Sequence, residues 1–169
     1  MSYLVETKCP FKWELLSAEQ PVVEFPMNYI AYSLLEQTGQ QVIARDNDFD
    51  SDIQRLDHKI DLVIQMLSQL INTQQTRPES ILLRLGAETI AWQNPQAKVG
   101  QQYLITLFLL EAIAVPIQAL VSITETDGDW CIAQFISQSA DEQSAWERWV
   151  FRQHRRQVAH ARDHTPHTI

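Results

Sequence analysis

The 169-residue sequence has little cysteine, little glycine and no long apolar run. Its two cysteines, Cys9 and Cys131, match neither a disulfide framework nor the spacing of a metal site. Four glycines leave little room for a phosphate-binding loop. No stretch approaches the ~20 apolar residues needed to span a bilayer, so we expect no membrane insertion.

Signals for catalysis and for export are also missing. Neither a G-x-S-x-G nor an H-E-x-x-H motif occurs, so we expect no catalytic residue and no enzyme activity. The acidic run DNDFDSD resembles the opening of a calcium loop, but Ser51 stands at its glycine position, and we expect no metal site. The amino terminus, MSYLVETKCPFKW, lacks the basic start and apolar core of a signal peptide, which predicts a cytoplasmic protein.

Positive charge is scarce: the sequence has 13 Lys and Arg residues and 21 Asp and Glu residues, which gives a net charge of −8. The molecule as a whole should repel polyanions, so we expect no nucleic-acid partner. Basic residues gather only near the carboxyl end, at Arg148, Arg152, Arg155, Arg156 and Arg162. This cluster could contact a phosphate, an acidic protein or a nucleic acid. Alternatively, it could complement the dipole of its own helix and pair with the acidic first turn of a neighbouring helix.

The pattern along the chain predicts one α+β domain over residues 1–169. Residues 22–26 suit an edge strand between two prolines, and residues 28–77 are predicted to be helical, with a short helix over 28–37 and a long one over 47–76. Residues 80–138 read as four strand-like segments, over 80–92, 101–112, 115–126 and 129–137, typical of a small antiparallel barrel or sandwich. A capping box, Ser139 with Glu142, predicts a final helix over 139–163.

The long central helix carries an unbroken apolar seam. With Ile53 at heptad position a, three consecutive heptads have apolar residues at a and d. Further apolar residues widen the stripe to roughly 200° in the carboxy-terminal half, whereas a helix lying on its own barrel needs only about 100°. We call the predicted assembly surface the heptad face; it consists of Phe49, Ile53, Leu56, Ile60, Val63, Ile64, Leu67 and Leu70.

Self-association is the simplest explanation of the heptad face. Six seam residues from Ile53 to Leu70 amount to about 9–18 kcal/mol per helix when fully buried, comparable with the 4–15 kcal/mol that association costs. The alternative is that the whole face belongs to an intramolecular core. Apolar flanks favour more than two helices, so we expect a homo-oligomer, a tetramer before a dimer.

Three segments resemble the atypical PilZ domains of proteobacteria, the tetrameric subgroup: RLDHKIDLVIQMLSQLI (55–71), LRLGAETIAWQNPQAKVGQQYLITLFLL (83–110) and WVFRQHRRQVAHAR (149–162). The likeness runs from about residue 29 to residue 162. It implies a PilZ-type antiparallel β-barrel with an inserted long heptad-bearing helix and a C-terminal helix. Ordinary PilZ domains bind cyclic di-GMP through R-x-x-x-R in a loop before the barrel and D/N-x-S-x-x-G on a barrel strand.

This chain departs from both ligand motifs. The strand motif aligns with residues 84–89, where Arg84 replaces Asp or Asn, Gly86 replaces serine and Thr89 replaces glycine. Before the barrel the expected arginine pair is reduced to Arg45, among aspartates. The spacing R-x-x-x-R recurs at Arg152 and Arg156, but on the predicted terminal helix. We therefore expect the standard nucleotide site to be lost and no cofactor to be bound.

The sequence thus predicts a non-catalytic, oligomeric PilZ-like adaptor associated with cyclic di-GMP signalling, motility or pilus biogenesis. Its partners would be other copies of itself and a motility, pilus or signalling protein. The rival hypothesis is a true cyclic di-GMP receptor with a relocated arginine cluster, formed by Arg152, Arg155 and Arg156 and completed by Arg84 or by another subunit.

Overall fold

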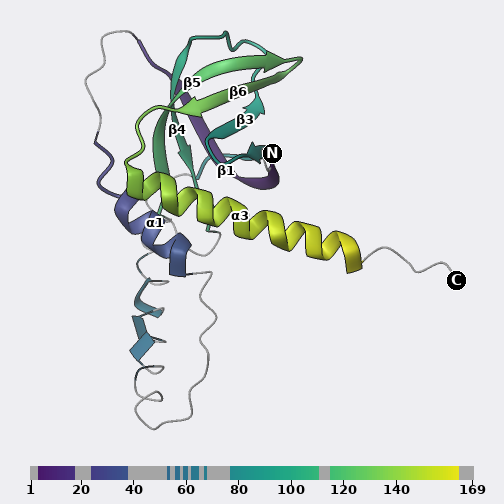
Figure 1. The fold of residues 1–169 in the computed structure, drawn as a ribbon. Helices are drawn as coiled ribbons and strands as arrows, with labels where there is room; N and C mark the ends of the chain where they lie inside the picture. The colour runs from purple at the N-terminus through teal and green to yellow at the C-terminus, as the bar shows by residue number, and fades with distance from the viewer. Residues whose placement is uncertain are drawn as a thin grey trace, which may run out of the picture.

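The fold is a closed, six-stranded antiparallel barrel with helices packed beside it (Figure 1). The computed structural model describes residues 4–17, 24–37, 53, 56–57, 59–60, 62–64, 67, 77–110 and 115–163, with only the backbone of 162 and 163. The strand order around the barrel is β1-β2-β3-β6-β5-β4. The elements are β1 Val5–Leu15, α1 Asn28–Gln37, β2 Ser80–Leu85, β3 Thr89–Gln93, β4 Gln102–Leu107, β5 Ile117–Asp127, β6 Trp130–Phe135 and α3 Ala140–Asp163. The predicted α+β class and barrel are confirmed.

Strand β1 closes the barrel, and the sequence did not predict it. Its first half pairs with β2, from Val5↔Leu85 to Pro10↔Ser80, and its second half pairs with β4, from Phe11↔Leu107 onward. Pro10 argues against a strand in the sequence, because proline donates no ladder hydrogen bond. The structure accommodates Pro10 because β1 changes partners directly after it.

The predicted edge strand over residues 22–26 is wrong where the structure describes it. Residues 24 and 25 lie outside any strand, and residues 26 and 27 form a turn that leads into α1. Residues 22 and 23 lie outside the described residues. The two prolines that bracket this stretch fit the connection into a helix equally well, since proline favours turn positions as much as sheet edges.

The first predicted strand, residues 80–92, is two strands. The chain turns at residues 86–88 and pairs back on itself in the register Leu85↔Ile90, with the Gly86 amide donating to the Thr89 carbonyl at 2.8 Å. The other three strand-like segments contain β4, β5 and β6. The predicted Asp-Gly turn joins the last two, and Gly128 has a φ of 59°, which favours glycine.

Helix α1 forms over residues 28–37, as predicted, and is fixed to the barrel at its first residue. Asn28 is 3% exposed. Its side-chain Nδ2 donates to the carbonyl of Gln118 at 2.7 Å, and its Oδ1 accepts from the amide of Gln118 at 2.9 Å. The side chain thus pairs with β5 as a neighbouring strand would.

Helix α3 begins at the predicted capping box and covers the barrel beside α1 (Figure 1). The Ser139 amide donates to Glu142 at 2.9 Å, and the Glu142 amide donates to the Ser139 hydroxyl at 3.2 Å. Trp146, Trp149 and Val150 are buried against the core. The indole of Trp146 stacks on Trp149 and donates to the Gly86 carbonyl at 2.9 Å, which joins the helix to the β2–β3 turn.

Candidate functional sites

The described part of the heptad face is helical, and all of its described side chains except the half-buried Ile64 are exposed. Each of its residues that the structure describes lies in helix, at positions 53, 56, 60, 63, 64 and 67. The exposed fractions are 45% for Ile53, 60% for Leu56, 49% for Ile60, 53% for Val63 and 53% for Leu67. None of these side chains belongs to the buried core of the barrel. Phe49 and Leu70 lie outside the described residues.

Arg84 stands on β2, directly before the turn that aligns with the family's ligand motif. Its Nε donates to a carboxylate oxygen of Glu6 at 3.0 Å, in an ion pair. Its guanidinium carbon lies 4.1 Å from the ring centroid of Trp130, a cation–π contact. Arg84 is therefore already engaged by two neighbours, Glu6 and Trp130.

The motif positions Gly86 and Thr89 are sterically coupled. A Cβ atom built on Gly86 would lie 2.5 Å from Thr89 Oγ1, closer than real Cβ atoms approach. A serine at residue 86, as the family motif has it, would therefore force the Thr89 hydroxyl to move, whereas glycine at residue 89 would leave the space open. The two departures from the motif fit each other. Gly86 lies in the β2–β3 turn and Thr89 is the first residue of β3, so the aligned motif spans a turn rather than lying within one strand, which corrects the placement expected from the sequence.

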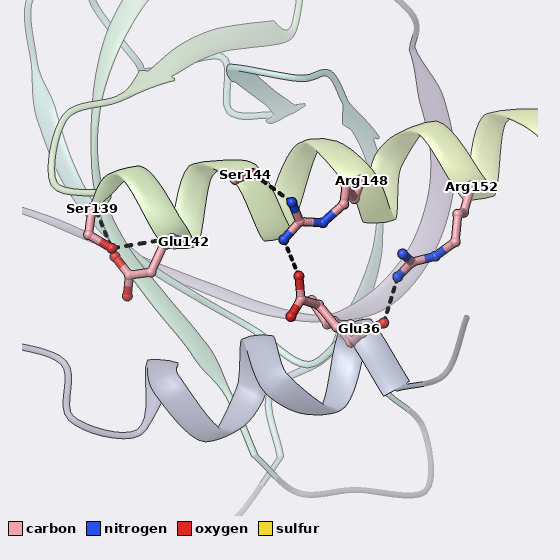
Figure 2. A network of polar contacts seen from close by, with 7 residues as sticks. Glu36, Ser139, Glu142, Ser144, Arg148 and Arg152 are labelled. Carbon is pink, nitrogen blue, oxygen red and sulfur yellow. Dashed lines mark hydrogen bonds and ion pairs between the residues drawn. The ribbon is translucent and has the colours of Figure 1, made fainter. Parts of the chain in front are cut away.

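Two arginines of the terminal cluster join α3 to α1 (Figure 2). Arg148 donates to Ser144 Oγ at 2.7 Å and forms an ion pair with Glu36. Arg152 donates to the backbone carbonyl of Leu35 at 2.6 Å. That carbonyl lies in the last turn of α1, where unpaired carbonyls and the negative end of the helix dipole attract cations. The expectation that the cluster complements a helix dipole fits Arg152, although the helix is its neighbour rather than its own.

Arg155 and Arg156 of the terminal cluster face solvent. Arg155 and Arg156 are both exposed, and the Arg155 guanidinium lies 5.9 Å from the ring centroid of Phe151. The side chain of Arg162 lies outside the described residues. Gln157 donates to the Glu6 carbonyl at 2.7 Å, so this part of α3 lies near the residue that also binds Arg84. Arg84 and Arg152, however, are engaged by different partners. In the described part of the chain, no hydrogen bond or ring contact joins the predicted cluster of Arg84, Arg152, Arg155 and Arg156 into one site.

A groove between α1 and the first turns of α3 was not foreseen from the sequence. Its volume is about 400 Å³, within the usual range for small-molecule pockets. Its walls carry both charges and aromatic rings, including Tyr29, Tyr32, Glu36, Asp141, Glu142 and Arg148. No local pattern of residues in the sequence predicts the groove, because it forms between two helices that are more than 100 residues apart in the chain.

The two cysteines are buried in the barrel. Burial raises the pKa of both the Cys9 and the Cys131 thiol to about 11, so the nucleophilic thiolate is scarce at neutral pH. Among the described residues, none form a group of three or more His, Cys, Asp and Glu that could hold a metal ion. Likewise, no helix in the described parts of the chain is both long and apolar enough to cross a membrane.

Comparison with solved structures identifies the class of fold. The chain is similar to a Xanthomonas campestris protein whose crystal structure is described as a tetrameric PilZ domain self-assembled through a helical bundle, with a TM-score of 0.69 and 22% identity. The match covers 93% of this chain and 90% of the other. At this identity the likeness shows the fold, and it is a PilZ-type barrel.

Residues 36–163 match the family described as "Atypical PilZ domain, cyclic di-GMP receptor". The chain belongs to this family, and the resemblance stated from the sequence is confirmed. No curated protein matches the chain.

Proposed function

We propose that the protein is a cytoplasmic, non-catalytic adaptor in cyclic di-GMP signalling that works as an oligomer assembled through the heptad face. The observation that carries the proposal is the exposure of that face. Five large aliphatic side chains at helical spacing, from Ile53 to Leu67, are 45–60% exposed in the single chain. Exposed apolar surface of this extent is rare on monomeric proteins and marks an interaction site.

A tetramer is the assembly we favour. Apolar residues that flank the seam favour bundles of more than two helices. The structurally similar Xanthomonas protein is described as a tetramer held by a helical bundle, which supports the same arrangement here. The partners beyond the oligomer would be proteins of the motility, pilus or signalling machinery, in line with the resemblance.

The nucleotide affinity of the chain itself should be weak or absent. Arg84 is engaged by Glu6 and Trp130, and Gly86 and Thr89 together fill the space that the family's serine would need. The carbonyl of Gly86 also accepts the Trp146 indole, so α3 packs on this turn. The second candidate is a genuine cyclic di-GMP receptor, which the description of the family favours.

The mass in solution tests the assembly. We expect a tetramer by light scattering, and we expect Ile60→Asp combined with Val63→Asp to give a smaller species, since two charges per helix cannot be buried in an apolar seam. Circular dichroism should show that the strands survive. Unchanged mass in the variant, or a monomeric parent protein at high concentration, would contradict the proposal.

Calorimetry with cyclic di-GMP separates the two candidate functions. The adaptor should show little or no heat of binding at low salt. Micromolar binding that Arg155→Ala and Arg156→Ala abolish would establish the receptor instead. The same titration with Arg152→Ala needs the thermal stability as a control, because Arg152 also holds the end of α1.

A further inference from the structure

The carboxy-terminal end of α3 extends past the body of the barrel (Figure 1). From residue 155 to residue 161 each side chain is exposed. A helix of 24 residues is about 36 Å long, which is more than the barrel contact around Trp146 and Trp149 requires. Gln157 is the residue of this stretch that donates to β1, at the Glu6 carbonyl. A short helical stretch with few tertiary contacts is marginal in water, so a further contact that covers it would stabilise it.

One face of this stretch combines apolar and cationic side chains. Phe151 and Val158 are 48% and 36% exposed, and they lie two helical turns apart on the same side as Arg155. The Arg155 guanidinium lies over the Phe151 ring at 5.9 Å. We call these three residues the α3 face. Aromatic and arginine side chains are the residue types that dominate the energetic centres of protein interfaces.

Charge decides what kind of partner fits the α3 face. Among the described residues, none forms an ion pair with Arg155 or Arg156, whereas Arg148 and Arg84 are paired with Glu36 and Glu6. The chain as a whole has a net charge of −8 and repels other acidic molecules. Arg155 and Arg156 thus form a local positive patch on an acidic protein, and this patch would attract an acidic partner.

We propose that the α3 face binds an acidic amphipathic helix of another protein, with aliphatic residues of that helix over Phe151 and Val158 and a carboxylate on Arg155. The three residues, at i, i+4 and i+7, form one stripe along the helix, and a second helix packs on such a stripe at an interaxial distance of about 8–10 Å. A nucleic acid would use the cations but leave the apolar pair unused. The inference adds a partner surface to the proposed adaptor and is independent of the heptad face.

The test uses a synthetic, fluorescently labelled peptide of about 15–20 residues, long enough to form a helix, with leucine at helical spacing and glutamate elsewhere. Its anisotropy is followed as the full-length protein is added. We expect saturable binding that weakens as salt is raised. A peptide of the same composition in scrambled order, which loses the apolar stripe, should bind at least about tenfold more weakly.

Two neighbouring arginines provide a matched pair of variants. Arg155→Glu should weaken peptide binding at least about tenfold, because Arg155 lies on the α3 face. Arg156→Glu makes the same change in net charge one residue further on, about 100° around the helix, and should weaken binding by no more than about threefold. The double variant Phe151→Ser with Val158→Ser should also bind the peptide at least about tenfold more weakly. Light scattering and circular dichroism should be unchanged in all three proteins.

Several results would overturn the inference. Equal losses for Arg155→Glu and Arg156→Glu would reduce the effect to net charge, and equal binding of the scrambled peptide would remove the role of the apolar pair. Absence of saturable binding would also contradict it, as would a preference for duplex DNA or cyclic di-GMP over the peptide. Because the mass in solution is measured on the same samples, a failure of self-assembly is recognised separately.

Discussion

The interior of the barrel and the heptad face are built from the same kinds of residue, but only the first is covered by the chain itself. Leu83, Leu85 and Ile90 are 0% exposed inside the barrel. Leu56 and Ile60, of the same types, are 60% and 49% exposed. Hydrophobic composition alone therefore does not separate a core from an interface; the extent to which the fold covers each side chain does.

The topology explains the difference. A closed barrel pairs every strand with two neighbours, and its inward side chains meet one another across the interior. The heptad face lies on an inserted helix that the barrel does not need for closure. Its apolar stripe therefore lacks an equivalent partner among the described residues, which is what a surface reserved for other copies of the chain requires.

A leucine-to-alanine substitution in the barrel and one on the heptad face should differ most in their cost to the free energy of unfolding. Leu85→Ala removes buried methyl groups and leaves a cavity, so it should lower the free energy of unfolding by about 2–5 kcal/mol. Leu56→Ala removes the same atoms from an exposed position and should cost less than about 0.5 kcal/mol. Urea denaturation followed by tryptophan fluorescence measures both.

Both variants are best made in the protein that already carries Ile60→Asp and Val63→Asp, so that unfolding is separated from dissociation. In the parent background Leu56→Ala should instead raise the protein concentration at which the oligomer dissociates. A loss of more than about 2 kcal/mol for Leu56→Ala in the dissociated background would mean that the heptad face is covered within one chain, and the contrast would be broken.

The packing of the β2–β3 turn gives a smaller effect within the barrel. Gly86→Ala places a Cβ atom 2.5 Å from Thr89 Oγ1 and should cost about 1–2 kcal/mol. Thr89→Ala removes the oxygen that clashes. In the double variant the cost should therefore be lower than the sum of the two single costs by at least about 0.5 kcal/mol. Strictly additive losses would show that the two positions are not coupled and that the motif was lost at each independently.

Local sequence signals predicted the elements whose causes are local. The short helix over 28–37, the Asp-Gly turn and the capping box of Ser139 with Glu142 each depend on residues close in the sequence, and each is present. Over most of their length, strands β4 to β6 alternate buried with mostly half-buried residues at period two, which is visible in the sequence. The family resemblance supplied the barrel, which periodicity alone left open between barrel and sandwich.

What the sequence did not predict depends on long-range contacts. Strand β1 contains Pro10 and is stabilised by pairing with segments about 70 and 90 residues later. Its local sequence therefore indicates a strand only weakly. The joint between α1 and α3 depends on Arg148 meeting Glu36, 112 positions apart. The arginine cluster was recognised as a unit, but only the fold reveals that it divides into joint residues and solvent-facing residues.

Arg148 and Arg152 join α3 to α1, and replacing one should cost a different free energy of unfolding from replacing the other. This difference is the smallest effect we expect. The pair of Arg148 and Glu36 is exposed on both sides, so Arg148→Ala should cost less than about 1 kcal/mol. Arg152 is less exposed and donates to a backbone carbonyl at the end of α1. Its removal leaves that carbonyl without its charged donor and should cost about 1–2 kcal/mol.

Hydrogen exchange locates the loss as well as measuring it. Arg152→Ala should speed exchange in the last turn of α1 and leave strands β4 and β5 protected, because the barrel closes without this contact. Arg152→Lys should recover part of the stability, since an ammonium also complements the helix end but lacks the planar fork of arginine. If Arg152→Ala instead made strands β4 and β5 exchange faster, the contact between α3 and α1 would be needed for the stability of the barrel itself. The barrel would then not be independent of α3, and the comparison between a self-sufficient barrel and helices available for partners would fail for α3.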